Sequence, residues 1–170
     1  MAVPGGGWDR PDRWRLGRRD GRPVAAVAEF ATDLRIHCAV TGDLETYDVL
    51  EGEPHGPGLL AVDDRAGPTL AVVARRDGAV WCWDLTTEAA YCPPLTGCPG
   101  APNGARLGRW RDRPVAALLT DTGVSLYDLR DRSWIGHVGL GAKAHDVAFA
   151  PRGELVIVSA HGTLVVRPMP

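Results

Sequence analysis

The stretch L-G-R-R-D-G-R-P-V-A-A at residues 16–26 recurs as L-G-R-W-R-D-R-P-V-A-A at residues 107–117. Both copies fit the pattern L-G-R-x-x-x-R-P-V-A-A, and they lie 91 residues apart. Half of this offset is about 45 residues, and T-L-A-V-V-A at residues 69–74 lies where an intermediate copy of the P-V-A-A segment is expected. The sequence therefore indicates a repeat of roughly 45 residues.

A second set of segments gives the same period. Four stretches with alternating apolar residues begin at residues 34, 80, 124 and 164, which are 46, 44 and 40 residues apart. Repeats of this length are typical of the four-stranded blades of a β-propeller. The stretches are residues 34–37, 80–85, 124–129 and 164–167.

Local signals favour strands throughout. Runs rich in Val and Leu that are bounded by turn residues are typical of strands. Asp77-Gly78 and Thr122-Gly123 separate two such pairs of runs, and Asp-Gly is a strong hairpin signal because glycine tolerates a positive φ. The 14 prolines and 21 glycines interrupt the chain too often for long helices. The fold class predicted is all-β.

Length and charge limit the function classes. A chain of 170 residues fits one domain, and a net charge of −2 gives no global case for binding nucleic acid or an anionic membrane. The longest apolar runs have five residues, which is too short to span a membrane, and residues 1–22 lack the apolar region of a signal peptide. We therefore expect a cytoplasmic protein with reduced cysteines, whose partners are neither nucleic acid nor membrane.

Several segments resemble the motifs of the WD-repeat family. The family patterns D-G-x-V-x-x-W-D-L, V-A-F-S-P-D-G and P-L-x-G-H are similar to residues 77–85, 147–153 and 94–98, with Cys98 in place of the usual histidine. Tyr127-Asp128-Leu129 is the counterpart of W-D-L in the third unit. The first unit departs from the pattern, since His37 replaces the tryptophan and Cys38 the aspartate. Together the motifs cover roughly residues 13–168.

The resemblance implies a β-propeller of four blades, each with four antiparallel strands. A flexible segment at residues 1–12 would precede a propeller domain at 13–168, with blades near residues 13–50, 58–95, 104–139 and 144–168. The second blade is predicted to have strands 58–63, 69–75, 79–85 and 88–95, and the third 104–110, 114–120, 124–129 and 132–138. We expect Trp81 or Trp83, and Trp110, in the core between blades.

No sequence motif indicates catalysis. None of the five histidines is paired at the i, i+4 spacing of a helical metal site, no cysteines form C-x-x-C, and no G-x-S-x-G or phosphate-binding glycine loop is present. The polar tetrad of many WD repeats is eroded. We therefore predict no catalytic residue, cofactor or metal. The alternative is a small propeller enzyme, a lyase or hydrolase, whose separated loops bring titratable groups together at a channel end.

Two matching turns carry the candidate partner-binding residues. These are Arg18, Arg19 and Arg22 in the first unit and Arg109, Arg111 and Arg113 in the third. Guanidinium forks suit carboxylate and phosphate groups, so the turns would present an anion-binding face to a protein partner. The competing interpretation is a solvated turn, partly neutralised by Asp20 and Asp112. The predicted function is a non-catalytic scaffold for protein interaction or assembly.

The end of the chain raises the question of closure. The fourth unit ends at its third strand, residues 164–167, and lacks an outermost strand. In WD-repeat propellers an N-terminal segment commonly supplies that strand, but Pro4-Gly5-Gly6-Gly7 makes residues 1–12 a poor candidate. Either one chain closes as a four-blade ring, or two chains join head to tail as an eight-blade ring. We favour the homodimer; a truncated relative of a longer propeller is the third alternative.

Overall fold

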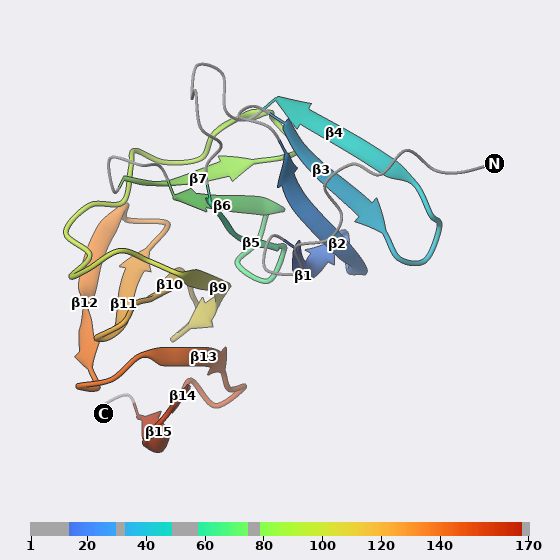
Figure 1. Ribbon diagram of the computed structural model, residues 1–170. Coiled ribbons are helices and arrows are strands. Elements are labelled where there is room, and N and C mark those ends of the chain that lie inside the picture. Colours follow the sequence, from blue (N-terminus) through green and yellow to red (C-terminus); the bar gives the residue numbers. More distant parts are fainter. Residues whose placement is uncertain (1–13, 30–32, 49–57, 75–78, 168–170) are drawn as a thin grey trace.

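A computed structural model describes residues 14–29, 33–48, 58–74 and 79–167 (Figure 1). These residues form four antiparallel sheets that are arranged as the blades of a propeller, and none of them lies in a helix. The predicted all-β propeller fold is confirmed. The predicted flexible segment 1–12 and the Asp77-Gly78 hairpin lie outside the described residues.

Consecutive strands pair within each blade, in the order of the chain. Blade 1 consists of β1 (Trp14–Arg19), β2 (Arg22–Glu29), β3 (Asp33–Cys38) and β4 (Leu44–Asp48). Blade 2 consists of β5 (Gly58–Asp63), β6 (Leu70–Ala74), β7 (Val80–Asp84) and β8 (Ala89–Ala90). Blade 3 consists of β9 (Gly104–Trp110), β10 (Arg113–Leu119), β11 (Gly123–Asp128) and β12 (Ser133–Gly139). Among the described residues, blade 4 has three strands, β13 (Ala144–Phe149), β14 (Leu155–Ser159) and β15 (Gly162–Val166).

The predicted strands of blades 2 and 3 match the observed bounds closely, with one exception. The outermost strand of blade 2 was predicted at residues 88–95, but β8 spans only Ala89–Ala90. Pro93 and Pro94 follow, and proline has no N–H to donate to a strand ladder. Pairing resumes only as a single bridge between Val80 and Leu95. The long prediction was therefore wrong because the prolines interrupt the ladder.

The repeated motif forms a tight hairpin in both copies. The β1–β2 turn has positive φ at Asp20 (49°) and Gly21 (73°), and the β9–β10 turn has positive φ at Arg111 (52°) and Asp112 (61°). Two successive residues with positive φ are the mark of a type I′ turn, whose twist matches that of paired strands. The first and third repeats therefore form the same type of turn. The first uses Asp20-Gly21, and the third uses Arg111-Asp112, which contains no glycine.

The hydrophobic core consists of three clusters, one at each junction between consecutive blades. The first joins blades 1 and 2 and includes Val24, Leu34, Ile36, Leu59, Val62 and Val73. The second joins blades 2 and 3 and includes Leu60, Leu70, Val72, Leu107, Leu118 and Tyr127. The third joins blades 3 and 4 and includes Val115, Leu119, Leu126, Val147, Leu155 and Ile157. The half-buried Trp81 and Trp83 pack against the first cluster and Trp110 against the third, as predicted.

The glycine of the L-G-R motif allows the innermost strands to approach each other. A Cβ added to Gly17 of β1 would lie 1.6 Å from the carbonyl oxygen of Val62 in β5. A Cβ added to Gly108 of β9 would lie 2.3 Å from Cδ2 of Phe149 in β13. An added side chain would meet backbone atoms at Gly17 and the Phe149 ring at Gly108, so the repeated glycine favours close packing between neighbouring blades.

The four blades form an open arc rather than a closed ring (Figure 1). Each blade packs on the next in sequence, and among the described residues no strand of blade 4 is in extended contact with a strand of blade 1. The outer side of blade 1, the first end face, contains the paired row Leu16, Ala25, His37 and Leu44. The outer side of blade 4, the last end face, contains Ala148, Val156, Val158 and Val165.

These end faces expose apolar side chains. Leu16 is 83% and Leu44 51% exposed on the first end face, and Val158 is 41% and Val165 47% exposed on the last. The corresponding faces between blades are buried in the three core clusters. Each end of the arc thus presents a sheet face that has no neighbouring blade within the described part of the chain. In that part, no helix is long and apolar enough to cross a membrane.

Candidate functional site

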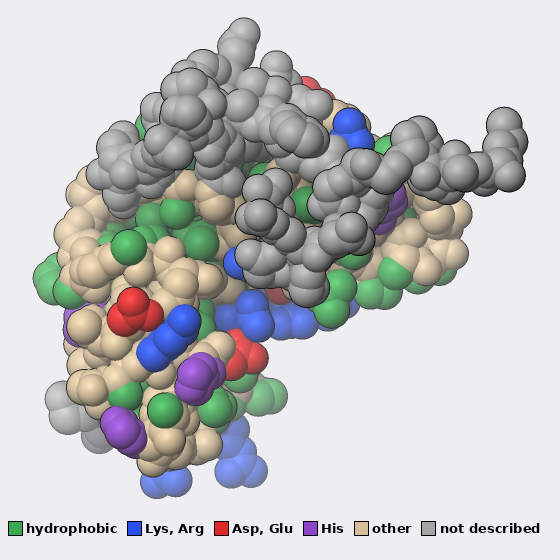
Figure 2. Space-filling view, viewed as in Figure 1, with side chains coloured by type: hydrophobic (Ala, Val, Ile, Leu, Met, Phe, Trp, Pro, Cys, Tyr) green, Lys and Arg blue, Asp and Glu red, His purple; other side chains and the backbone are tan. Residues whose placement is uncertain are grey.

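A cleft of about 700 Å³ lies between the innermost strands of blades 3 and 4. We call it the arginine cleft, because its charged lining residues are Arg65, Arg106, Arg109, Arg111, Asp112, Asp146 and Arg152. Its apolar lining includes Leu107, Val147, Phe149 and Pro151. In Figure 2, Lys and Arg side chains lie along the inner side of the arc.

Three of the four inner turns contribute to this cleft. Arg111 and Asp112 come from the β9–β10 turn, Arg152 from the β13–β14 turn and Arg65 from the β5–β6 turn. A smaller cleft of about 300 Å³ shares Arg65, Arg106 and Leu107 with it and extends to Gly17 and Leu16 of β1. The innermost strands and their turns therefore define one continuous, arginine-lined surface.

Local hydrogen bonds and one ion pair hold part of the cleft in place. Arg106 Nε lies 2.9 Å from Asp146 Oδ1, which joins β9 to β13, and Arg106 Nη1 donates to the carbonyl oxygen of Ala105 at 3.1 Å. Arg109 Nη2 donates to the carbonyl oxygen of Asp112 at 2.6 Å. The guanidinium of Arg111 lies over the ring of Trp110, 5.2 Å from its centroid. With five arginines and two aspartates, the lining carries a formal excess of positive charge.

Of the six predicted arginines, only Arg109 and Arg111 line the arginine cleft. Arg18 makes the same turn contact as Arg109, since its Nη2 donates to the carbonyl oxygen of Gly21 at 3.1 Å. Its Nε also lies 3.9 Å from Asp64. The arginine of the L-G-R motif therefore has a structural role in both repeats, because its hydrogen bond to a turn carbonyl stabilises the type I′ turn.

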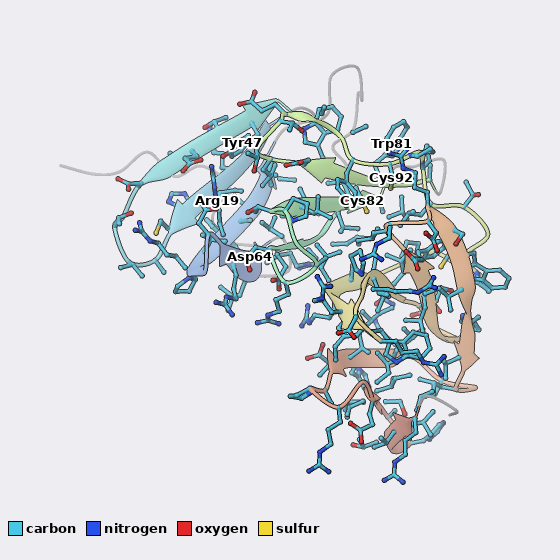
Figure 3. All side chains as sticks on the ribbon, turned by 180° about the vertical axis from the view of Figure 1, so that it is seen from behind. Arg19, Tyr47, Asp64, Trp81, Cys82 and Cys92 are labelled. Atoms are coloured by element: carbon cyan, nitrogen blue, oxygen red, sulfur yellow. The ribbon has the colours of Figure 1, made fainter. Side chains whose placement is uncertain are left out.

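Arg19 and Arg22 belong to a separate corner of blade 1. Arg19 donates to the carboxylate of Glu45 and to the hydroxyl of Tyr47, and its guanidinium lies 5.3 Å from the Tyr47 ring centroid (Figure 3). Burial raises the pKa of Tyr47, while the charge of Arg19 opposes the rise. Arg22 is exposed and lines a recess of only about 70 Å³ with Arg19 and Cys38.

Arg113 is a structural ion-pair residue. Its Nη1 lies 2.9 Å from Asp128 and 2.8 Å from Asp131. The Asp128 side chain is 2% exposed, and its Oδ1 also accepts the backbone N–H groups of Arg130 and Asp131. Burial disfavours ionisation of Asp128, but the Asp131 N–H, the Arg113 guanidinium and the Arg130 N–H outweigh it and lower the pKa.

The sequence reading missed Arg65, Arg106 and Arg152. Arg106 had a signal, since the repeat extends one residue further as R-L-G-R and Arg106 matches Arg15. Both arginines donate to the carbonyl oxygen of the preceding residue. Arg65 and Arg152 occupy inner turns at equivalent places in blades 2 and 4, but the sequences around them do not match. Arg65 and Arg152 could have been predicted only from their position in the turn after the first strand of a blade, because the surrounding sequence is not repeated.

Asp63 is the buried carboxyl group of the smaller cleft. Its Oδ1 accepts the backbone N–H of Arg65 at 3.0 Å, and its Oδ2 lies 3.6 Å from Arg65 Nη1. Burial raises the pKa of Asp63, although the N–H and guanidinium of Arg65 act in the opposite direction. A carboxyl group with a raised pKa in a cleft is a candidate acid or base.

A hydrogen-bonded chain of Cys98, Ser125 and His137 lies in blade 3, away from both clefts. The Cys98 thiol donates to Ser125 Oγ at 3.5 Å, and Ser125 Oγ lies 3.0 Å from His137 Nδ1. Ser125 is fully buried, and burial raises the pKa of Cys98. A buried hydroxyl cannot reach a substrate, so this chain braces the loop before β9. Sequence reasoning missed it because its members come from three separate segments.

The cysteines and carboxylates form no metal centre in the part of the chain that the structure describes. No three His, Cys, Asp or Glu residues there are close enough to hold a metal ion. Cys82 and Cys92 are both buried in blade 2 as free thiols (Figure 3). The contact with Cys92 and burial raise the pKa of Cys82.

Comparison with known proteins supports the fold. No protein-family model matches the chain, and no curated protein matches it. The computationally designed Ika4 protein is similar in structure, with a TM-score of 0.60, 15% identity, and coverage of 94% of this chain and 93% of that chain. The designed Ika8 protein is also similar, with a TM-score of 0.58, 16% identity, and coverage of 90% of this chain and 46% of that chain. This chain thus matches nearly all of Ika4 and about half of Ika8.

Proposed function

We propose that the chain is a WD-repeat-like propeller that serves as a non-catalytic scaffold for protein interaction and assembly. The observation that carries the proposal is the make-up of the arginine cleft. Its described lining residues combine five guanidinium groups with the apolar side chains of Phe149 and Pro151, and include two carboxylates, Asp112 and Asp146. Arginine is enriched at the energetically important positions of protein interfaces, whereas the described lining has no Ser, Thr or Cys nucleophile of the kind that many hydrolases use.

The partner is a protein that contacts this side of the blades. The motifs at residues 77–85 and 147–153 resemble those of WD-repeat proteins, which commonly act as scaffolds, and this analogy supports a protein partner. Arg111 and Arg152 project from neighbouring inner turns, and both are exposed. Arg65 and Arg109 are the other exposed arginines of the cleft, but Arg65 lies beside Asp63 and Arg109 braces its turn.

A capture experiment with paired charge variants tests the interaction. The double variant Arg111→Glu/Arg152→Glu reverses two charges in the cleft. Arg130→Glu/Arg167→Glu reverses two exposed charges outside it, so both baits have the same net charge. From lysate of the native host, wild type and the control should retain the same protein, and the cleft variant should lose it. Equal retention by all three baits would refute the cleft as the interaction site.

The assembly part of the proposal is a homodimer that closes the propeller. Contiguous exposed apolar surface promotes association, and each end face resembles in construction the faces that pack between blades. Two chains joined head to tail would bury both end faces of each chain in two identical contacts.

Light scattering coupled to gel filtration tests this assembly. The chain has a mass of 18.2 kDa, and we expect twice this mass in solution. Leu16→Glu, on the first end face, should give a monomer, whereas Ile135→Glu, which alters an exposed apolar residue of β12, should not. A wild-type mass near 18.2 kDa would reject the dimer, and an unchanged dimer in Leu16→Glu would reject the end face as its interface.

The alternative function is a small propeller lyase or hydrolase that uses Asp63. Its burial and raised pKa at the smaller cleft are the observations that favour it. A screen of nitrophenyl esters and glycosides with wild type and Asp63→Asn separates the two functions. Turnover that is lost in Asp63→Asn would establish the enzyme, and turnover that is unchanged by this substitution would exclude Asp63 as its catalytic residue.

A further inference from the structure

We propose that the arginine cleft recognises an acidic peptide segment that carries an apolar side chain beside its carboxylates. This inference rests on the proposed interaction function and adds the chemistry of the partner. A volume of about 700 Å³ is within the range of ligand pockets and has room for a few peptide side chains. Simple charge attraction does not account for the accessible apolar side chains of the cleft, which include the half-buried Phe149 and the exposed Pro151.

The positive charge of the cleft is only partly compensated by the protein. Asp146 is occupied by Arg106, and Arg109 uses one N–H to brace its turn. Arg111 and Arg152 are both exposed and line the cleft from neighbouring inner turns, and Arg111 also lies over the ring of Trp110. Guanidinium groups bind carboxylates through paired N–H donors, so Arg111 and Arg152 are the residues assigned to the peptide carboxylates.

The backbone at Arg111 supports a role beyond turn formation. Arg111 and Asp112 both have positive φ, which is uncommon for residues other than glycine. The matching turn of blade 1 has Asp20 at the position of Arg111, and aspartate is enriched at positive φ among residues other than glycine. A long cationic side chain therefore occupies a position where a smaller turn residue fits better. Retaining a locally unfavourable residue at a cleft is typical of a functional position.

The ligand is an acidic peptide rather than a nucleic acid. A nucleic-acid backbone is bound along an extended basic surface, because several phosphates are neutralised together. Here the net charge of the chain is −2, and the described lining of the cleft has five arginines and two aspartates. The Phe149 and Pro151 side chains beside the guanidinium groups suit the side chain of a Phe or Leu between acidic residues, as at a protein interface.

Fluorescence anisotropy with defined probes tests the ligand class. The probe is a fluorescein-labelled octapeptide of sequence Gly-Asp-Glu-Phe-Asp-Glu-Leu-Gly. Its controls are the same peptide with Asn and Gln in place of the acids, the same peptide with Ala in place of Phe and Leu, and a labelled ten-nucleotide thymidine strand. Wild type should bind the acidic peptide at least about tenfold more tightly than each control, and more weakly as salt rises. Tighter binding of the nucleotide strand, or equal binding of the neutral peptide, would overturn the proposal.

Variants of the full chain locate the site. Arg111→Glu/Arg152→Glu should weaken peptide binding about tenfold or more, and Arg130→Glu/Arg167→Glu should leave it within about twofold. Arg111→Gly should weaken binding while the melting temperature stays the same or rises, because glycine tolerates the positive φ. If Arg111→Gly leaves the affinity unchanged, Arg111 is a turn residue only and the assignment is wrong.

The binding experiments distinguish failure of the peptide chemistry from failure of the interaction site. If no octapeptide binds, but the cleft variant still loses the partner captured from lysate, the peptide chemistry is refuted and the interaction site stands. If the octapeptide binds only to sites that the cleft variant leaves intact, the inference is refuted as well. Loss of both peptide and partner in the cleft variant alone supports both levels together.

Discussion

Substitution of the two L-G-R glycines measures how closely the innermost strands must pack. In Gly108→Ala, the new Cβ would lie 2.3 Å from Cδ2 and 2.9 Å from Cγ of Phe149, so the ring must move. Overpacking of this kind costs about 1–3 kcal/mol. In Gly17→Ala, the Cβ would lie 1.6 Å from the backbone oxygen of Val62. No rotamer change relieves a backbone clash, so we expect a loss of at least about 3 kcal/mol.

Two further variants make this prediction specific. Gly136 in β12 has no atom within 4 Å of an added Cβ, so Gly136→Ala should be neutral or should stabilise the fold by up to about 1 kcal/mol. Replacing Phe149 with Ala removes the atoms that Gly108→Ala meets. The cost of Gly108→Ala should therefore shrink by about 1 kcal/mol or more in the Phe149→Ala background, while the cost of Gly17→Ala stays the same.

Urea unfolding and scanning calorimetry supply the measurements. For a chain of this length, each kcal/mol corresponds to roughly 2–4 °C in melting temperature, so Gly17→Ala should melt at least about 6 °C below wild type. A Gly17→Ala protein as stable as Gly136→Ala would show that β1 and β5 do not approach each other as described. Additive effects of Gly108→Ala and Phe149→Ala would refute the contact between β9 and β13.

Three other predictions concern single groups. The pKa of Asp128 is lowered in the folded state, so its contribution to stability is present above the unfolded value of about 3.9 and is lost as pH falls through the folded pKa. Asp128→Asn should therefore melt below wild type at neutral pH, and a series of melting curves down to about pH 3 should show the gap closing. A hydrogen bond from the Thr41 hydroxyl lowers the pKa of the Cys38 thiol, so iodoacetamide should label Cys38 before the other cysteines. Peptide mass mapping should show that Cys38 is labelled more slowly in Thr41→Val. Trp83→Ala should cost about 3 kcal/mol in urea unfolding, the lower end for a core tryptophan, because the ring is only half-buried; a loss below about 1 kcal/mol would place the ring outside the core.

The repeat pattern predicted the fold because each blade repeats the same local signals. Turn residues and alternating apolar runs define the hairpins, and the 40- to 46-residue spacing defines how many there are. The short β8 was missed because the effect of Pro93 and Pro94 on the ladder was given too little weight. Such errors affect the edge of a blade and leave the count of blades unchanged.

The candidate site was predicted only in part, because its residues are brought together by contacts between blades. The arginine of the L-G-R motif was interpreted as its important residue, yet the glycine tolerates substitution less. An added Cβ at this glycine would meet β5 in the first copy and β13 in the second, and the motif itself does not show these contacts. Arg113 seemed equivalent to its neighbours in sequence, but strand register places it beside Asp128. A single sequence carries no direct signal for either contact.

The chain-like order of the blades has a consequence for how the molecule comes apart. Among the described residues, the extensive contacts of each blade are with its neighbours in sequence, so stability is approximately a sum of blade and junction contributions. Blades 2 and 3 have two junctions each, whereas blades 1 and 4 have one each. Opening should therefore begin at the ends of the arc, and amide hydrogens of β14 and β3 should exchange with solvent before those of β6 and β10. Addition of a second copy at the end faces would supply the missing junctions and make exchange nearly uniform along the chain.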